Sequence, residues 1–140
     1  MAQAGYSGTP LPQKLGIKEA HKVALVKAPK GFALTGLPTG ASVQHGLAGR
    51  GKTPPLLDVI LAFVTQRADL VTQVAVGRAR MQQAGGLWIA WPKQASGVAT
   101  DITEQTIRDV ALPTGLVDNK VCAIDDTWSG LRLVWRKELR

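Results

Sequence analysis

DVILAFV, residues 58–64, is the stretch that decides the fold. Every residue after the aspartate is apolar, and Val59, Ile60 and Val64 are β-branched. A short, continuous apolar run of this kind is typical of a strand that is buried on both faces, and β-branched side chains favour strands. The stretch therefore predicts a buried strand of the kind found in parallel sheets.

A helix and a second buried strand are expected directly after this stretch. From Arg67 onward, small and apolar residues recur at helical spacing and predict one apolar stripe, formed by Ala68, Val71, Ala75 and Ala79 with Val74 and Met81 beside it. Gly85 and Gly86 are expected to end this helix, because glycine readily takes the left-handed conformation. LWIAW, residues 87–91, predicts the next strand, which Pro92 closes.

The remainder of the chain predicts a helix and a hairpin. Asp101 lies three residues before Glu104, the spacing of a capping box, and the helix is expected from about Ile102 to Leu112. VDNKVCAI (117–124) and LRLVWRKEL (131–139) then predict two strands. The six residues between them can join only antiparallel neighbours.

Upstream of residue 58 the pattern is less regular. VALVKAP, residues 23–29, predicts a first buried strand, and residues 29–57 are rich in Gly, Pro and Thr, with one brief strand expected near ASVQ. We expect a single domain over residues 1–140, with an N-terminal arm (1–22), a first strand and irregular crossover (23–57) and a regular half (58–140). The fold class is α/β: a small three-layer Rossmann-like, mostly parallel sheet with a C-terminal antiparallel β-hairpin.

Composition narrows the function classes. The 140 residues include one cysteine, Cys122, which excludes an intramolecular disulfide and a cysteine-built zinc site and is expected to be a small buried residue. His21 and His45 lie apart from each other and from any carboxylate cluster, so no metal is expected. With no signal-peptide core and no long apolar run, the expected location is the cytoplasm, without a membrane partner.

The net charge of +7 raises the question of a polyanion partner. No carboxylate occurs between Glu19 and Asp58, whereas that interval holds five cations: Lys22, Lys27, Lys30, Arg50 and Lys52. Neither interleaved aromatic residues nor a recognition helix accompanies them. Nucleic-acid binding by the basic N-terminal third is therefore an alternative and not the favoured partner class.

From Asp58 onward the sequence resembles the second half of the Rossmann-like S-adenosylmethionine methyltransferases. DVILAFV, AGGLWIAWP and VCAIDDTWSGLRLVW fit the strand, helix and hairpin slots of that family in order. The resemblance implies a cofactor site with two features: an acidic, glycine-rich turn after the first strand and an acidic residue at the end of the second strand. Here the turn is KAPKGF (27–32) and the carboxylates are missing, so the cofactor-binding motif is lacking and S-adenosylmethionine is not expected.

The whole chain also resembles a family of short bacterial proteins of unknown function. GYSGTPLPQKLGIK (5–18), WPKQASGVATDITE (91–104) and CAIDDTWSGL (122–131) carry this likeness. The resemblance implies relatives but no activity.

GLAGRGKT, residues 46–53, matches the phosphate-loop pattern literally. Such a loop opens a helix whose N–H groups hold the phosphates, but Pro54 and Pro55 follow Thr53 and have no N–H to donate. VCAIDD (121–126) has the look of a magnesium-positioning strand end, a pattern common in other folds. ATP or GTP binding is therefore not expected, and a flexible basic loop is the favoured interpretation.

In open parallel sheets, ligands bind beyond the carboxyl ends of the strands. We expect four loops at that edge, residues 27–32, 65–67, 92–96 and 125–129, and their polar residues are the ligand-binding candidates: Lys93, Ser96, Asp125, Asp126, Trp128 and Ser129. Each has a structural alternative. The aspartates suit a turn, Trp128 could cover the sheet edge, Lys93 could pair with an aspartate, and Asp101 suits a helix cap.

Three functions follow from these patterns. The leading hypothesis is a non-catalytic binding or regulatory module that recognises a small polar ligand or a protein through the Lys93 and Asp125 edge. The second is a divergent enzyme, either a methyltransferase or an acid–base catalyst using Lys93, Asp125 and Asp126. The third is polyanion binding by the basic N-terminal third. The sequence names no catalytic residue, and its ligand, reaction, oligomeric state and biological process stay open.

Overall fold

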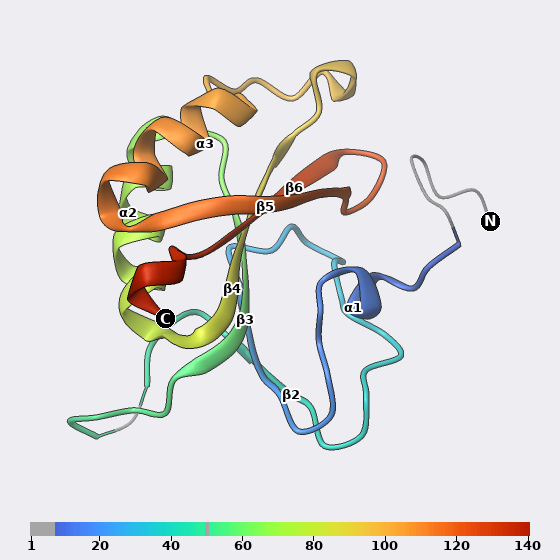
Figure 1. The fold of residues 1–140 in the computed structure, drawn as a ribbon. Coiled ribbons are helices and arrows are strands. Elements are labelled where there is room, and N and C mark those ends of the chain that lie inside the picture. The colour runs from blue at the N-terminus through green and yellow to red at the C-terminus, as the bar shows by residue number, and fades with distance from the viewer. Residues whose placement is uncertain (1–7, 50) are drawn as a thin grey trace.

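A computed structural model describes residues 8–49 and 51–140 of the chain. The centre of the molecule is a six-stranded sheet in the order β2-β1-β3-β4-β6-β5 (Figure 1). Its strands are β1 Lys22–Val26, β2 Ser42–His45, β3 Leu57–Phe63, β4 Met81–Pro92, β5 Leu116–Ala123 and β6 Trp128–Trp135. The α-helices are α1 Leu11–Lys14, α2 Arg67–Arg80 and α3 Glu104–Ala111, and three short 3-10 helices are η1 Gln94–Ser96, η2 Leu112–Thr114 and η3 Lys137–Leu139.

Four neighbouring strands, β2, β1, β3 and β4, run parallel, and β6 is antiparallel to both β4 and β5. The predicted mixed α/β sheet with a C-terminal hairpin is therefore confirmed. The brief strand expected near ASVQ is β2, which pairs with β1 from Lys22 opposite Ser42.

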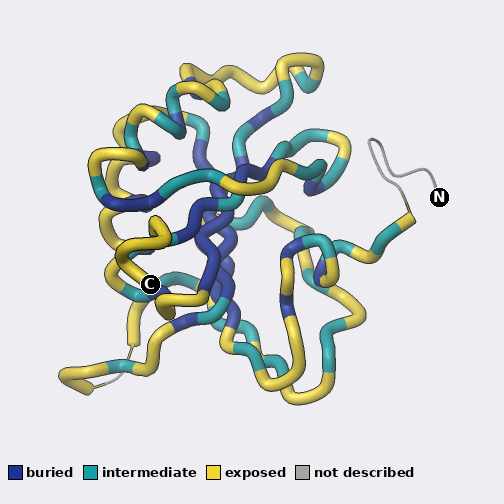
Figure 2. Tube along the Cα trace, viewed as in Figure 1, coloured by how far each residue is buried: buried dark blue, intermediate teal, exposed yellow. Residues whose placement is uncertain are grey.

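β3 is buried on both faces, as its sequence predicts. Ile60, Ala62 and Val64 belong to the core on one side of the sheet, and Leu61 and Phe63 belong to the core on the other. Figure 2 shows the strands as the buried centre of the molecule, with exposed segments around them. Since a strand points successive side chains to opposite faces, one continuous apolar run supplies both cores.

Helices α2 and α3 cover one face of the sheet (Figure 1). The buried positions of α2 include Leu70, Val74 and Gly77, while Ala68 and Val71 are exposed, so the predicted stripe over Ala68, Val71, Ala75 and Ala79 is wrong. Leu70 packs better because its larger side chain removes more apolar surface from water than an alanine can. At Gly77 an added Cβ would lie 3.0 Å from a Leu87 methyl group, so glycine allows the helix to approach β4 closely.

The other face is covered by irregular chain. Leu15 and Ile17, from the segment that contains α1, pack there against Leu25, Leu61 and Trp88. The crossover between β1 and β2 adds partly buried side chains to this second core, among them Phe32, Leu34 and Leu37. The third layer of the fold is therefore a wrapped segment and not a helical layer.

A buried hydrogen bond joins this wrapped segment to the sheet. The fully buried Trp88 donates its indole N–H to the carbonyl oxygen of Leu15 at 3.0 Å. A buried indole N–H without a hydrogen-bond acceptor costs free energy. Burial of Trp88 is therefore favourable only when the segment with Leu15 is in place.

The end of α2 differs from the prediction. The helix ends at Arg80, and β4 begins at Met81, so Gly85 and Gly86 lie inside the strand and do not end the helix. Leu57 is opposite Met81 while Val59 is opposite Gly86, so β4 contains extra residues at this point. An added Cβ at Gly85 would lie 2.9 Å from the Asp58 carbonyl oxygen, which explains why glycine is needed within this bulge.

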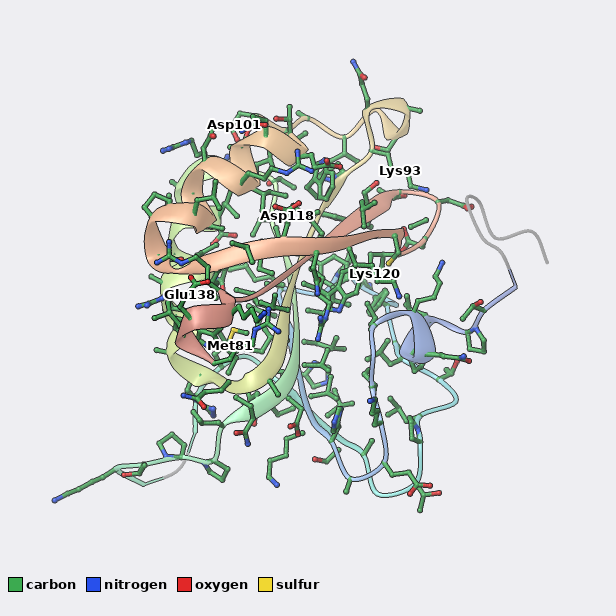
Figure 3. All side chains as sticks on the ribbon, viewed as in Figure 1. Met81, Lys93, Asp101, Asp118, Lys120 and Glu138 are labelled. Carbon is green, nitrogen blue, oxygen red and sulfur yellow. The ribbon has the colours of Figure 1, made fainter. Side chains whose placement is uncertain are left out.

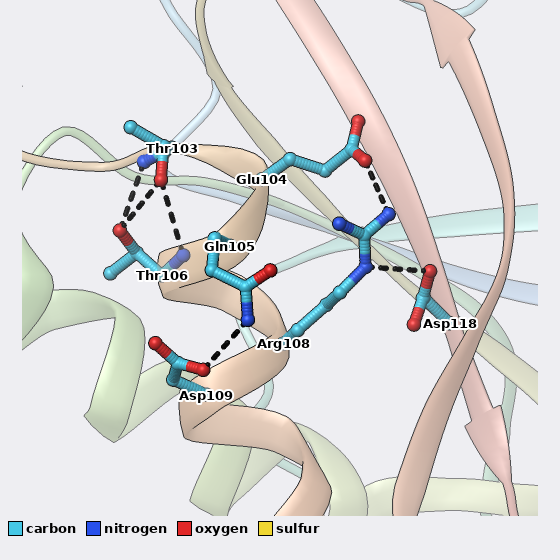
Figure 4. A network of polar contacts seen from close by, with 7 residues as sticks. All are labelled: Thr103, Glu104, Gln105, Thr106, Arg108, Asp109 and Asp118. Carbon is cyan, nitrogen blue, oxygen red and sulfur yellow. Dashed lines mark hydrogen bonds and ion pairs between the residues drawn. The ribbon is translucent and has the colours of Figure 1, made fainter.

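The cap of α3 also differs from the prediction. Thr103 and Thr106 form a reciprocal capping box, with Thr106 N donating to Thr103 Oγ1 at 3.2 Å (Figure 4). Asp101 does not cap α3. Its Oδ1 accepts a 2.8 Å hydrogen bond from the backbone N–H of Arg67, the first residue of α2. The carboxylate therefore stabilises a different helix from the one that follows it in the sequence.

An ion-pair network joins α3 to the sheet (Figure 4). Arg108 on α3 pairs with Glu104 on the same helix and with Asp118 on β5, whose Oδ2 lies 3.1 Å from Arg108 Nε. The hydrogen bond to Asp118, and next the one to Glu104, raise the pKa of the Arg108 guanidinium. The network fixes the orientation of α3 over the hairpin side of the sheet.

Candidate functional site

An open pocket of about 460 Å³ lies at the carboxyl ends of the parallel strands. Its lining comes from the end of β1, the end of β3 with the first turn of α2, and the start of β6, through Lys27, Phe63, Thr65, Gln66, Asp69 and Trp128. Pockets for small ligands fall at about 300–1,000 Å³, and open α/β sheets place them at this edge. We call it the carboxyl-edge pocket.

Lys27 spans the mouth of this pocket. It follows β1 directly and has a φ of 57°, a left-handed conformation that side-chain-bearing residues rarely adopt. Its Nζ lies 2.9 Å from Asp69 Oδ1 in the first turn of α2. The ion pair therefore links the ends of β1 and β3 across the switch point of the sheet.

Aromatic rings form one wall of the pocket. Phe63 lies edge-to-face with Phe32, with centroids 4.9 Å apart, and with Trp128, with centroids 5.1 Å apart. The three rings come from the β1–β2 crossover, β3 and β6. Such pairs hold their rings in fixed orientations, so the wall is preformed and presents an apolar surface beside the Lys27 and Asp69 charges.

The four loops predicted to meet at this edge do so. Lys93 N donates to the Thr127 carbonyl oxygen at 2.8 Å, which joins the loop after β4 to the β5–β6 turn. Lys27, Thr65 and Trp128 bring three of the loops to the same pocket. Figure 3 places Lys93 at this edge, near the β5–β6 turn.

Two of the candidate residues make hydrogen bonds within their own turns. Asp125 Oδ1 accepts from the backbone N–H groups of Thr127 and Trp128, each at 2.9 Å. Ser96 Oγ donates to the Lys93 carbonyl oxygen at 2.7 Å and accepts from Val98 N at 3.2 Å. Both side chains therefore stabilise the geometry of their loops, and for Asp125 this is the structural alternative that the sequence offered.

Of the other four candidate residues, one lines the pocket and three lie outside its lining. Trp128 lines the carboxyl-edge pocket, whereas Lys93, Asp126 and Ser129 do not. Lys93 and Ser129 are partly buried, and Asp126 is exposed. Their role in binding a ligand stays a prediction.

Residue-by-residue reasoning missed most of the pocket lining. Phe63 reads as strand core, and Asp69 reads as an ordinary acidic residue in the first turn of a helix. Lys27, Thr65 and Gln66 lie in loops that were predicted at the edge but were not singled out. Asp69 could have been found from its place in the first turn of the helix that follows β3.

A larger hollow, of about 500 Å³, lies beside the edge strand β2 and near the amino ends of β1 and β3. Lys22, Gln44 and Arg80 are among its lining, and Arg80 Nη1 donates to the Pro55 carbonyl oxygen at 2.9 Å. We favour the smaller carboxyl-edge pocket, because ligands of open α/β sheets bind at the carboxyl ends.

The phosphate-loop match does not open a helix. Within residues 46–49 and 51–56 the chain forms bends and irregular structure, and it then continues into β3. Arg50, in the middle of the match, lies outside the described residues, as does the start of the GYSGTPLPQKLGIK motif. A phosphate-binding loop needs the free N–H groups of the helix that follows it. Here a strand follows, so those N–H groups are missing.

Cys122 is half-buried and packs at the margin of the second core. Burial raises the pKa of its thiol, while the charges of Lys14 and Lys120 act in the opposite direction. Among the described residues, no group of three or more His, Cys, Asp or Glu side chains is arranged to hold a metal ion. In the same part of the chain, no helix combines the length and apolar character required to span a membrane.

Solved structures share this fold at low sequence identity. A SAM-dependent methyltransferase from Aquifex aeolicus is 14% identical with a TM-score of 0.62, over 86% of this chain and 85% of that one. TrmN from Thermus thermophilus is 13% identical with a TM-score of 0.63, and this chain (89% covered) matches 47% of its length. The Methanococcus jannaschii fibrillarin pre-rRNA processing protein is 13% identical with a TM-score of 0.59, over 96% of this chain and 87% of that one.

These similarities establish a methyltransferase-like fold and nothing about activity. No curated protein matches the sequence. Residues 48–137 match DUF3052, a family described as a protein of unknown function, and this range includes β3, both long helices and the terminal hairpin. The chain therefore belongs to the DUF3052 family and has a methyltransferase-like fold.

Proposed function

We propose that this protein is a non-catalytic binding module that holds a small polar ligand in the carboxyl-edge pocket. The observation that carries the proposal is the joint placement of the Phe63–Trp128 wall and the Lys27–Asp69 ion pair around one open volume at the switch point of the sheet. The aromatic wall would contact an apolar or planar part of the ligand. Lys27, Asp69 and the Gln66 amide would bind its polar groups.

The ligand proposed here is not S-adenosylmethionine. The turn after β1 carries the side chains of Lys27 and Pro29 where these methyltransferases are expected to have glycines, and Lys27 adds positive charge at the mouth of the pocket. The end of β2 is His45, and no carboxylate lies between Glu19 and Asp58 to bind ribose hydroxyls. The residues present do not fit a positively charged sulfonium cofactor.

The absence of a catalytic role is part of the same proposal. Asp125 and Ser96 are already used by backbone groups of their own turns, which removes two of the candidates for acid–base or nucleophilic chemistry from easy reach of a substrate. A general acid or base must reach the reacting atom directly or through one water. Binding without turnover is the function that these contacts support best.

Thermal unfolding in the presence of defined compounds tests the proposal. The panel holds amino acids, nucleosides, sugar phosphates, S-adenosylmethionine and S-adenosylhomocysteine. We expect at least one of the first three classes to raise the melting temperature, because a ligand that binds only the folded state stabilises it by mass action. Neither S-adenosyl compound should do so.

Paired lysine variants place the effect in the pocket. Lys27→Gln should abolish the stabilisation, and Lys30→Gln, which removes an exposed charge from the same loop, should retain it. Equal responses in both variants would remove the carboxyl-edge pocket as the site. Stabilisation by S-adenosylmethionine together with its slow consumption would instead support the divergent-methyltransferase hypothesis.

A further inference from the structure

A second, smaller pocket lies at the opposite end of the sheet from the carboxyl-edge pocket. It has a volume of about 140 Å³ and lies at the start of β4, beside β5 and β6, where Arg132 and Arg140 meet Gln83 and Asn119. This volume is well below the roughly 300 Å³ at which pockets for whole small molecules begin. It can hold an ion or one chemical group of a larger molecule.

Arg132 lines this pocket from the middle strand of the hairpin side of the sheet. On β6 it is paired with Trp88 of β4 and Lys120 of β5, so it projects from the interior of the hairpin side of the sheet. An added Cβ at Gly86 would lie 2.6 Å from Arg132 Nε. Glycine at that position lets the guanidinium lie directly over the backbone of β4.

No acidic side chain neutralises Arg132 within the described residues. In that part of the chain the guanidinium forms no ion pair and donates no hydrogen bond, although Arg132 is partly buried. Burial lowers the pKa of Arg132, and the positive charge of Arg140 lowers it further. A second cation where a carboxylate is expected raises the free-energy cost of burying the first.

Arg140 is held in place by backbone contacts. Its Nε donates to the Trp135 carbonyl oxygen at 2.8 Å, and its backbone N–H donates to the Lys137 carbonyl oxygen at 3.3 Å. Arg140 lines the pocket together with Arg132. Two arginine residues thus border one small volume.

We propose that this pocket binds a phosphate group. A phosphate carries up to two negative charges and accepts hydrogen bonds on several oxygens, and guanidinium groups bind it in bidentate geometry. The side-chain amides of Asn119 and Gln83 add neutral donors at the rim. The site takes either free inorganic phosphate or a phosphodiester of a polynucleotide, which present the same chemistry to the two arginines.

The proposal is independent of the carboxyl-edge pocket. The two pockets share no lining residue, and they lie at opposite ends of the parallel strands. Loss of ligand binding at one is therefore expected to leave the other intact, so failure of one proposal does not imply failure of the other.

Titration of the full, nitrogen-15-labelled chain tests the site. Sodium phosphate is added at constant ionic strength, with chloride as the balancing anion, and amide shifts of Gly85 and Asn119 are followed. Phosphate should shift both amides in a saturable manner. Arg132→Gln should weaken the affinity roughly tenfold, the effect of losing one charged hydrogen-bonding group.

Two further variants keep the test decisive. Arg140→Gln, at an exposed residue, should weaken phosphate binding without altering the fold. Arg136→Gln removes the same charge from an exposed residue outside the pocket and should leave the affinity unchanged. No saturable shift in the wild type, or equal loss in the Arg132 and Arg136 variants, would overturn the proposal.

A second arm, in which a ten-nucleotide thymidine oligomer replaces phosphate, separates the two sources. If Arg132→Gln weakens binding of phosphate alone, the ligand is the free ion. If it weakens binding of the oligomer as well, the pocket holds a backbone phosphate of a polynucleotide, and the affinity should also fall with salt. An oligomer affinity that depends equally on Arg132 and Arg136 would reflect general charge and would contradict a site for the polynucleotide.

Discussion

At the scale of single residues, Lys27 combines an unusual backbone conformation with a position in the proposed binding site. Its φ of 57° is costly for a residue with a Cβ, by about 1–2 kcal/mol, and its surface ion pair with Asp69 is worth about 0–1 kcal/mol. The ion pair alone therefore does not offset the strain. Strained residues cluster at binding sites, and this one lies at the mouth of the carboxyl-edge pocket.

Substitution by a β-branched residue measures this strain. Lys27→Val should lower the free energy of unfolding by about 1–2 kcal/mol, because valine is strongly disfavoured in the left-handed region. Lys30, in the same loop, does not have a positive φ. Lys30→Val should therefore change the free energy of unfolding by less than about 0.5 kcal/mol. Urea unfolding of both variants gives the comparison, and equal losses would mean that the conformation of Lys27 carries no special cost.

The thiol of Cys122 offers a pH-dependent test of burial. Burial is the largest influence on its pKa and raises it, so the folded protein retains the thiol proton at pH values where the unfolded chain has lost it. Stability contributed by this group is therefore present below the ordinary thiol pKa and falls as pH rises above it.

Alkylation rates measured across this pH range should show the difference. The rate with iodoacetamide should reach its half-maximum at a higher pH for the folded chain than for the chain in urea, because the thiolate is the reacting form. A folded midpoint at or below the unfolded one would show that Lys14 and Lys120 outweigh burial.

At the scale of elements, the strands and their succession along the chain were predictable, whereas the buried face of α2 and the cap of α3 were not. β3 and the core of β4 are continuous apolar runs, and the short β5–β6 connection can form only a hairpin. The buried face of α2 was not predictable, because Val71 is exposed and the helix approaches β4 through Gly77. Sequence spacing cannot identify a glycine that is buried by close approach.

The candidate site was predictable only in position. The rule for open sheets correctly placed the four loops at one edge, and Trp128 lines the pocket found there. The Lys27–Asp69 pair joins residues 42 positions apart, so no local pattern reveals it. Asp101 similarly caps a helix that begins 34 residues earlier, although its spacing to Glu104 indicates a local cap.

The role of Asp101 is testable by stability. Asp101→Ala removes the acceptor of the Arg67 N–H and a negative charge at the start of α2, and should lower the free energy of unfolding by about 1 kcal/mol. Glu19→Ala, which removes one exposed carboxylate elsewhere, is the control and should have little effect. A loss no larger than that of the control would indicate that the first turn of α2 is satisfied by solvent.

At the scale of the whole molecule, one sheet separates two different layers. Helices cover one core, and the other is closed by the segment around α1 and by the β1–β2 crossover. The Trp88 hydrogen bond to Leu15 joins this second layer to the centre of the sheet. The layer with little regular structure also supplies Lys27 to the lining of the carboxyl-edge pocket, and its Phe32 packs against Phe63 of the same lining. We therefore expect folding of this layer and formation of the pocket to be coupled.

Loss of this hydrogen bond should loosen the wrapped segment. Trp88→Phe leaves the Leu15 carbonyl without its partner and a cavity beside it, and should lower the free energy of unfolding by roughly 2 kcal/mol. Hydrogen exchange of the Leu15 and Ile17 amides should accelerate more than that of β6. Trp91→Phe, at a partly buried tryptophan of the other core, is the control and should leave this pattern unchanged.

Native mass spectrometry of protein purified gently from its own host would detect a ligand bound in the carboxyl-edge pocket. We expect an added mass on the wild type that differs from the masses of S-adenosylmethionine and S-adenosylhomocysteine. This mass should disappear in Gln66→Ala, whose side chain lines the carboxyl-edge pocket, and persist in Gln94→Ala, which lies on the same edge outside it. An S-adenosyl mass, or a wild-type protein without any added mass, would show that the carboxyl-edge pocket does not hold the proposed ligand.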